Sequence, residues 1–224
     1  VSRPVAPDGD HAARMDRIYR MQKFIYDATR KYYLLGRDQM IEALDCAPGD
    51  SVLEIGCGTG RNLALVARRY PDVRLFGVYI SAEMLRFARQ SLIRRIGPGR
   101  VQVAQGDARH CDPSSAFAEA GFDRIVFSYA VSMIPEWVGA VDRATEQMKP
   151  GAALLIVDFG DLRRWPSWAV RSLDGWLGLF HVRRRLDLAE RLGELSRRRG
   201  LHMWQTHYHG GYCTLYRLVR PRRG

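Results

Sequence analysis

The stretch Ser51-Val-Leu-Glu-Ile-Gly-Cys-Gly-Thr-Gly60 is an apolar run that ends in three closely spaced glycines. Its first half, Ser51 to Ile55, predicts a buried strand, and the spacing of apolar residues over 61–70 predicts a helix. Because glycine lacks a Cβ, the turn between them can be tight and can let the backbone approach a ligand closely. The stretch therefore predicts a strand, a ligand-binding turn and a helix in succession.

The spacing of these glycines excludes two common phosphate-binding turns. Position 61 is Arg, so the dinucleotide pattern G-x-G-x-x-G is not met after Gly56 and Gly58. The sequence also lacks the G-K-[ST] of a phosphate-cradling loop. NAD, FAD and nucleoside triphosphates are therefore disfavoured as ligands of this turn.

Strand-like and helix-like segments alternate outward from this turn. The further strands are predicted at 73–79, 101–104, 124–127, 152–157, 203–207 and 214–219, and the further helices at 82–94, 137–148 and 186–199. Ser81 is the expected N-cap of the second helix, and Lys149-Pro-Gly151 is expected to stop the third. This alternation predicts a doubly wound α/β domain with a mostly parallel sheet, whose ligands bind at the carboxyl ends of the strands.

Composition agrees with a globular chain of one domain. The 224 residues include 46% hydrophobic and 26% charged residues, and no apolar run reaches the length of a membrane span. Val1 to His11 carry Pro, Gly and Asp where a signal peptide needs an apolar run. The four cysteines form no C-x-x-C pair and have no histidine at metal-ligand spacing, so we expect free thiols, no metal site and a reducing cytoplasm.

The net charge of +11 arises from 35 basic and 24 acidic residues. Such a charge favours an anionic partner, either nucleic acid or an anionic membrane surface, and composition alone does not distinguish the two.

The glycine turn resembles motif I of the class I S-adenosylmethionine-dependent methyltransferases, and the likeness continues through Gly106-Asp-Ala108 and Phe122 to Ala130. It implies a Rossmann-like fold with seven strands, one of them an antiparallel closing strand. It also implies S-adenosyl-L-methionine as cofactor and S-adenosyl-L-homocysteine as product. Glu54 and the Gly56 carbonyl would receive the methionyl ammonium, and Asp107 with the Ala108 N–H would receive the adenine. The remaining cofactor-binding positions implied in this core are Cys57, Gly58, Gly60, Tyr79, Ile80, Met84 and Ser128.

The end of the second strand departs from the family. The family usually has an Asp or Glu there, which accepts from both ribose hydroxyls, whereas Phe76-Gly-Val-Tyr79 ends in Tyr. A phenol cannot accept both hydroxyls as a carboxylate does. The sequence therefore predicts weaker cofactor binding.

The segment before the first strand resembles, over nearly its full length, the amino-terminal region of the betaine-lipid N-methyltransferases, which methylate diacylglycerylhomoserine. The run Ile25-Tyr-Asp-Ala-Thr-Arg-Lys-Tyr-Tyr-Leu-Leu-Gly-Arg-Asp38 carries the likeness. It implies that residues 1–45 form a helical cap over substrate and cofactor, with residues 46–224 as the core. Tyr32, Tyr33 and Arg37 are then candidates for the methionyl carboxylate, since a guanidinium matches a carboxylate bidentately.

The insertion at about 161–185 has the composition of an interfacial segment. Tryptophans at helical spacing are bracketed by Arg163, Arg164 and the triplet Arg183 to Arg185. Indole rings at headgroup depth and arginines on lipid phosphates are typical of such segments, although a cap helix packed on the sheet has the same pattern. We expect a cytoplasmic protein associated peripherally with the inner face of an anionic membrane.

These observations predict an N-methyltransferase that converts diacylglycerylhomoserine to its trimethylated betaine lipid. Tyr129, His207 and His209 are the candidate catalytic residues, since they follow or close strands and could accept a proton from the amine. The alternatives are a phosphatidylethanolamine or small-amine N-methyltransferase, an RNA methyltransferase, and a cofactor-binding module without catalysis. The oligomeric state is not determined by the sequence.

Overall fold

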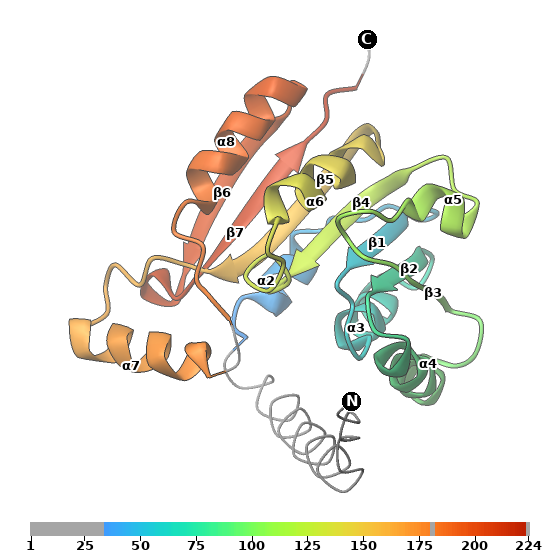
Figure 1. Ribbon diagram of the computed structural model, residues 1–224. Coiled ribbons are helices and arrows are strands. Elements are labelled where there is room, and N and C mark those ends of the chain that lie inside the picture. Colours follow the sequence, from blue (N-terminus) through green and yellow to red (C-terminus); the bar gives the residue numbers. More distant parts are fainter. Residues whose placement is uncertain (1–33, 180–181, 223–224) are drawn as a thin grey trace, which may run out of the picture. The chain divides into compact units, whose positions relative to one another are not determined.

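Seven strands form one sheet in the order β3-β2-β1-β4-β5-β7-β6 in the computed structural model, which describes residues 34–179 and 182–222 (Figure 1). The strands are β1 (Ser51–Ile55), β2 (Arg74–Tyr79), β3 (Val101–Gln105), β4 (Phe122–Ser128), β5 (Met148–Phe159), β6 (His202–Tyr208) and β7 (Cys213–Val219). β1 to β5 pair in parallel, and β7 runs antiparallel to both of its neighbours. The predicted Rossmann-like α/β fold with an antiparallel closing strand is confirmed.

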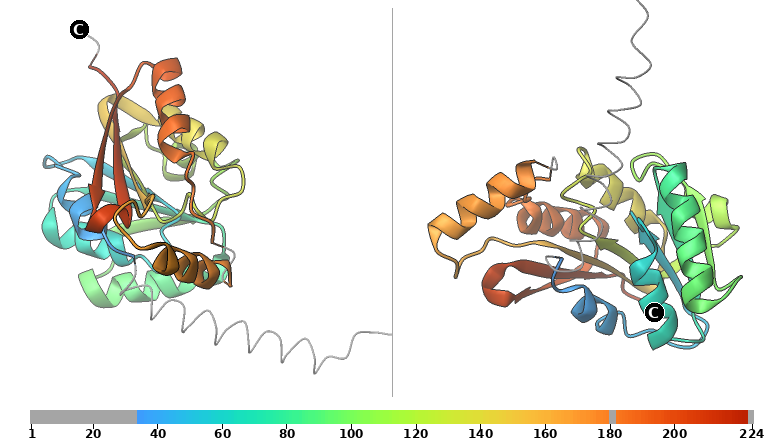
Figure 2. Two further views of the ribbon diagram at one scale, coloured as in Figure 1. Left: turned by 90° about the vertical axis from the view of Figure 1, so that its left-hand side faces the viewer. Right: turned by 90° about the horizontal axis from the view of Figure 1, so that it is seen from below.

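Helices cover both faces of this sheet. They are α2 (Arg37–Glu42), α3 (Arg61–Arg69), α4 (Ala82–Ile96), α5 (Pro113–Phe117), α6 (Trp137–Glu146), α7 (Ser167–Gly178) and α8 (Leu188–Arg199). With the sheet seen nearly edge-on, α2 and α3 lie against one face and α6 and α8 against the other (Figure 2, left). One cluster of the core lies under α6 and α8, and it includes Leu154 and Ile156 of β5 with Leu188 and Leu192 of α8.

One edge of the sheet collects the carboxyl ends of all the parallel strands. The hairpin between β6 and β7 lies at the same edge, because Cys213 at the start of β7 pairs with Phe159 at the end of β5. The glycine turn after β1, the loop after β4 and this hairpin are therefore brought to one side of the sheet. We call this side the carboxyl edge.

Two elements differ from the sequence prediction. β5 begins at Met148, four residues earlier than expected, because Met148 pairs with Phe122 before a register shift leads to the pairing of Arg124 with Ala153. The Lys149-Pro-Gly151 signal therefore lies within this irregular ladder, and α6 already ends at Glu146. The short helix α5 lies in a segment for which the sequence pattern predicts neither helix nor strand. Asp112 caps it by accepting from the Ser114 and Ser115 N–H groups.

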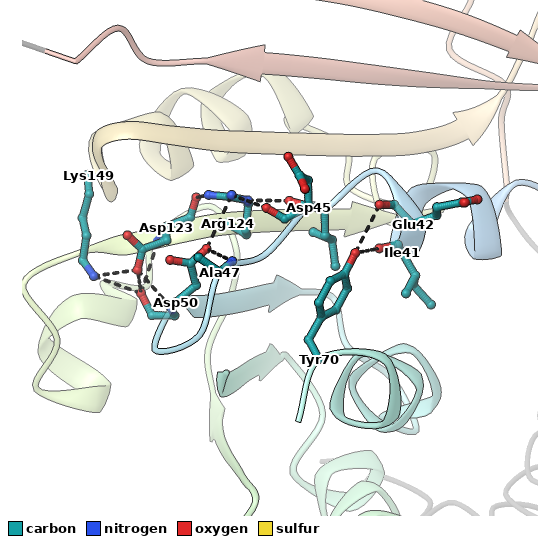
Figure 3. A network of polar contacts seen from close by, with 11 residues as sticks. Ile41, Glu42, Asp45, Ala47, Asp50, Tyr70, Asp123, Arg124 and Lys149 are labelled. Carbon is teal, nitrogen blue, oxygen red and sulfur yellow. Dashed lines mark hydrogen bonds and ion pairs between the residues drawn. The ribbon is translucent and has the colours of Figure 1, made fainter. Parts of the chain in front are cut away.

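A polar network ties the opposite, amino edge of the sheet together (Figure 3). At the start of β4, Arg124 Nε donates to the Leu44 carbonyl at 2.5 Å and its Nη2 donates to the Asp45 carbonyl at 2.6 Å. Lys149 Nζ lies 2.8 Å from Asp123 Oδ2. These bonds fix the loop between α2 and β1 on the side of the sheet away from the carboxyl edge, so they position β1 without taking part in a site.

Contacts within the chain divide it into two units, Val1–Leu35 and Gly36–Gly224, so that α2 belongs to the unit that contains the sheet. The predicted cap of residues 1–45 falls largely outside the described residues, and this division leaves its role a prediction. In the parts of the chain that the structure describes, no helix is long and apolar enough to cross a membrane.

Candidate functional site

The turn after β1 has the backbone conformation that only glycine adopts without strain. Gly56, Gly58 and Gly60 have φ angles of 82°, 53° and 74°. A Cβ on Gly56 would lie 2.8 Å from the Cβ of Ala130 in the loop after β4. The turn and the loop after β4 therefore meet at backbone distance, and a side chain at position 56 would force them apart.

A buried carboxylate stands at the end of β1 beside this turn. Glu54 Oε1 accepts from Asn62 Nδ2 at 2.7 Å, and both side chains are buried. Among the described residues, no donor reaches Asn62 Oδ1, which is also buried. An acceptor oxygen in this position has the chemistry to receive an ammonium or hydroxyl group of a ligand.

The start of α2 lies next to this turn. Asp38 Oδ1 is 3.9 Å from Arg61 Nη2, and Arg61 is the first residue of α3 after the turn. Arg37 precedes Asp38 in the first turn of α2 and is buried. The structure thus brings the predicted carboxylate ligand Arg37 to the same region of the sheet, whereas Tyr32 and Tyr33 lie outside the described residues.

The ends of β2 and β3 meet beside the turn as well. Gly106 N–H after β3 donates to the Tyr79 carbonyl at 3.1 Å, so Tyr79 and Asp107 are on adjacent strands. Ser81 accepts from the Met84 N–H and caps α4 as predicted. Met84, in the first turn of α4, is buried. Ile80, between Tyr79 and Ser81, is exposed.

Asp107, the predicted adenine acceptor, is already paired in this structure. Its carboxylate accepts from the Arg109 backbone N–H at 2.9 Å and from the Arg109 guanidinium at 2.6 and 3.1 Å. The hydrogen bonds from the Arg109 side chain lower the pKa of Asp107 to about 2. The carboxylate is charged at neutral pH, and an adenine amine would share it with Arg109. Ala108 lies between the two residues and is partly buried.

The carboxyl end of β4 supplies the opposite wall. Ser128 Oγ is buried and has no hydrogen-bond partner among the described residues. Tyr129 follows with a positive φ of 53°, and its ring packs edge-on against Phe159 with centroids 4.7 Å apart. Burial raises the pKa of the Tyr129 phenol well above its usual value, and the nearby Cys213 and Asp158 act in the same direction. Tyr129 is therefore a neutral phenol at the wall of the site.

His207 and His209 lie at the carboxyl edge but toward its far end. His207 is on the outermost strand β6, three strand spacings from β4, which is roughly 14 Å across the sheet. Its Nε2 is 2.9 Å from Arg163 Nη2, and its Nδ1 is 2.9 Å from Thr214 Oγ1. Since a guanidinium only donates, Nε2 accepts and Nδ1 carries the proton. The imidazole thus binds the insertion, and the backbone carbonyl of His209 likewise accepts from Trp165 Nε1.

The structure adds a buried acid that the sequence analysis did not select. Asp158, the second-to-last residue of strand β5, accepts from the Ser132 N–H at 3.0 Å and from the Phe159 N–H at 2.8 Å. Burial raises its pKa to about 6. Asp158 thereby holds the loop after β4, whose Ala130 faces the glycine turn. A single acid within the apolar run Leu154 to Phe159 was the signal in the sequence.

The residues present fit the S-adenosylmethionine that the sequence predicts. Ala130 leaves no space for a side chain at position 56, so the turn presents bare backbone at the carboxyl edge. Buried oxygens of Asn62 and Ser128 have no partner among the described residues on either side of the turn. Groups of histidine, cysteine and acidic side chains that could hold a metal ion are absent from the described part of the chain. The four cysteines are free thiols.

Comparisons with known proteins agree with this geometry. Residues 52–151 match the family profile described as "Methyltransferase domain". A protein-L-isoaspartate O-methyltransferase of Methanopyrus kandleri is 35% identical over 137 residues, covering 60% of this chain and 55% of that protein. A phosphatidylethanolamine N-methyltransferase of Cereibacter sphaeroides is 33% identical over 127 residues, covering 56% of this chain and 59% of that protein.

Among solved structures, the mitomycin 7-O-methyltransferase MmcR superimposes with a TM-score of 0.71 at 20% identity, covering 90% of this chain and 57% of that chain. A likeness at this identity shows the fold. The chain spans little more than half the length of the two curated relatives, so their reactions and substrates remain properties of those proteins.

Proposed function

We infer that this chain, with a methyltransferase domain at residues 52–151 and the class I methyltransferase fold, is an S-adenosylmethionine-dependent methyltransferase. The observation that carries the inference is the glycine turn. Its three positive φ angles and its close approach to the loop after β4 present bare backbone at the carboxyl ends of β1 and β4, where this fold class binds its ligands. Glu54, oriented by Asn62, is the group that receives the methionyl ammonium.

We propose an amine nitrogen as the methyl acceptor, and specifically the amine of diacylglycerylhomoserine. Two findings support an amine: the likeness of the run Ile25 to Asp38 to the betaine-lipid N-methyltransferases, and the 33% identity to a phosphatidylethanolamine N-methyltransferase. The aromatic wall of the site suits the product. Tyr129, Phe159 and Tyr212 follow one another with ring centroids 4.7 and 6.0 Å apart, and aromatic rings attract the cation that methylation of an amine creates.

Catalysis in this scheme depends on positioning. When bound, the sulfonium cofactor supplies a methyl group to a nucleophile that approaches in line. The protein holds the donor through the glycine turn, excludes water with the buried wall of Tyr129 and Phe159, and aligns the amine, which can supply an effective molarity of ~10⁵–10⁸ M. A neutral Tyr129 can accept a hydrogen bond from the amine but not act as phenolate, since its pKa is raised. Tyr129 stays a proposed catalytic residue on this ground.

The histidines are weaker candidates for the proton acceptor. His207 already uses both ring nitrogens, and His209 contributes its backbone to the contact with Trp165. We expect His207→Gln to leave the turnover number within about threefold, and Tyr129→Phe to lower it at least tenfold with the Kd for S-adenosylhomocysteine unchanged. Equal turnover for Tyr129→Phe and wild type would remove Tyr129 from the chemistry.

The deciding experiment offers the acceptor in detergent micelles, so that binding to a membrane plays no part. The full chain is incubated with labelled S-adenosylmethionine and with diacylglycerylhomoserine, phosphatidylethanolamine, or a total RNA, and the products are analysed by mass. Addition of one to three methyl groups to diacylglycerylhomoserine supports the proposal. Methylation of phosphatidylethanolamine alone, or of RNA alone, contradicts diacylglycerylhomoserine as the substrate. If the donor binds but no methyl group is transferred to any of the three, the chain is a cofactor-binding module.

A further inference from the structure

Helix α7 presents two large apolar side chains to solvent. Of its 12 residues only Leu177 is buried, whereas Trp168 is 67% exposed and Leu179, the residue that caps the helix, is 76% exposed. These two residues are about three helical turns apart and share one face. Ser172 and Gly175 lie on the same face between them, so small side chains leave the two large ones projecting. We call this the α7 face.

Three exposed arginines of the insertion have no acidic partner among the residues that the structure describes. The acidic residues of the insertion are both engaged, Asp161 with Arg163 and Asp174 with Arg184. Within the part of the chain that the structure describes, no ion pair involves Arg164, Arg171 or Arg183, and all three are exposed. An exposed apolar face together with these unpaired arginines is complementary to a surface that is both apolar and negatively charged.

The insertion is fastened to the carboxyl edge. Gly160 N–H donates to the Tyr212 carbonyl at 2.8 Å, and Leu162 N–H donates to the Gly211 carbonyl at 2.9 Å. Arg184 joins Asp174 of α7 at 2.6 Å and also donates to the Gly160 carbonyl at 3.0 Å. Figure 1 shows α7 projecting from this end of the sheet, beside the end of β5 and the start of β7. The α7 face therefore has a fixed place next to the candidate site.

We propose that the α7 face binds the surface of an anionic lipid bilayer. Trp168 and Leu179 would enter the boundary between headgroups and acyl chains, where indole rings are enriched and the apolar faces of interfacial helices are buried. Arg164, Arg171 and Arg183 would contact lipid phosphates. The carboxyl edge would then face the headgroups. The proposal concerns the surface and holds whichever amine is methylated, so it goes beyond the proposed function.

Vesicle flotation without substrate or cofactor tests the proposal. The full chain is mixed with vesicles of phosphatidylcholine alone, or of phosphatidylcholine with about a third phosphatidylglycerol, at low and at 0.5 M salt. We expect binding to the anionic vesicles at low salt, and at least tenfold weaker partition at high salt, since charges near a surface are screened. Absence of binding to anionic vesicles overturns the proposal. It is also overturned if the protein binds RNA but not vesicles and if replacing the same arginines abolishes the binding of RNA.

Two sets of variants locate the contact. We expect partition to fall at least tenfold in each of two double variants, Trp168→Ser with Leu179→Ser and Arg164→Glu with Arg171→Glu. The first removes the apolar side chains that would be buried in the bilayer. The second removes two cations, and one charge near an anionic surface changes binding about fivefold. Their matched controls are Trp204→Ser on β6, whose side chain is 56% exposed, and Arg94→Glu with Arg95→Glu at the end of α4. Equal losses in a control and in the α7 variants would overturn the assignment to this face.

Vesicle binding by the α7 face can be measured independently of methyl transfer. Each variant is checked for its Kd for S-adenosylhomocysteine, which should equal that of the wild type. Fluorescence quenching by brominated lipid then reports whether tryptophan enters the bilayer. Compared at equal amounts of bound protein, the quenching should fall when Trp168 is replaced and persist in the arginine variants. Vesicle binding without any methyl transfer contradicts only the proposed function. Methyl transfer in micelles without vesicle binding contradicts only the proposal that the α7 face binds a bilayer.

Discussion

Tyr79 occupies the position at which the family resemblance implies a ribose-binding carboxylate. It lies at the end of β2 and is half-buried, next to the strand that leads to Asp107. A phenol contacts one ribose hydroxyl where a carboxylate contacts two, and a hydrogen bond to a charged acceptor contributes about 1.5–3 kcal/mol. We therefore expect Tyr79→Asp to lower the Kd for S-adenosylmethionine about tenfold, measured by calorimetry. Tyr79→Phe is the control, and an unchanged Kd for Tyr79→Asp would contradict the placement of the ribose here.

The pairing of Asp107 with Arg109 predicts a competition for the adenine. Arg109 occupies both carboxylate oxygens at 2.6 to 3.1 Å. We expect Arg109→Ala to tighten the binding of S-adenosylhomocysteine severalfold, because the carboxylate becomes available, and Asp107→Ala to weaken it. The double variant should bind like Asp107→Ala. If Arg109→Ala binds no better than the wild type, Asp107 is not the adenine acceptor.

The buried Asp158 predicts a dependence of stability on pH. Its pKa is raised from 3.8 to about 6 in the folded protein, so the folded state holds a proton that the unfolded state releases. Between about pH 4 and pH 6 the free energy of unfolding should therefore fall as the pH rises, by at most about 1.4 kcal/mol per pH unit from this group. Urea unfolding should show that Asp158→Asn flattens this slope.

Asp161→Asn is the control for this experiment. The pKa of Asp161 is lowered by its bonds with Arg163 despite the opposing effect of burial, so its contribution to stability is lost at low pH instead. The slope between pH 5 and pH 6 should remain in Asp161→Asn. A slope that persists in Asp158→Asn would show that another group titrates there.

Among the elements, the insertion depends on a backbone contact with the β6–β7 hairpin. A Cβ on Gly160 would collide with the Gly211 carbonyl, which already accepts from Leu162. We expect Gly160→Ala to lower the free energy of unfolding by about 1–3 kcal/mol, as other overpacked sites do. Gly175→Ala is the matched variant, because nothing lies within 4 Å of its Cβ.

Gly175 lies within α7, so alanine there should raise the free energy of unfolding by up to about 1 kcal/mol through helix propensity. Both variants are compared by urea denaturation. If the two substitutions have equal effects, the contact between the insertion and the hairpin does not hold α7 in place.

The β5 ladder shows how pairing changes an element that local signals describe well. Lys149-Pro-Gly151 indicates the end of a helix, and α6 does end shortly before it. However, Phe122 pairs with Met148, and this pairing extends the strand back through the signal as an irregular ladder. By contrast, α8 and β6 follow their predicted ranges within a few residues, because their patterns are long and periodic.

For the whole molecule, ligand binding and folding should be linked. The glycine turn, Glu54 and the loop after β4 come from separate segments, so the site exists only in the folded chain. At a hundred times its Kd, S-adenosylhomocysteine should raise the free energy of unfolding by about 2.7 kcal/mol. Thermal unfolding measures this shift, with NAD as the control nucleotide. In Gly56→Ala the shift should disappear, whereas an equal shift with NAD would contradict the specificity of the site.

Several features of this protein follow from the order of its residues alone. The alternation of strand and helix patterns predicts the parallel sheet, because each amphipathic segment must bury one face. The glycines at 56, 58 and 60 predict the turn, because only glycine adopts three such φ angles so closely without strain. The site residues Glu54, Asp107 and Ser128 lie at strand ends, where the fold class places a ligand.

Tertiary structure decided which of these groups are available. Asp107 is paired with Arg109, Tyr129 is a buried phenol, and His207 is held by Arg163 and Thr214. Asp158 gains its role only because the sheet brings β5 against the loop after β4. Side-chain pairing, burial and the resulting pKa shifts depend on neighbours that are distant in the chain, and local sequence patterns carry no information on which neighbours those will be.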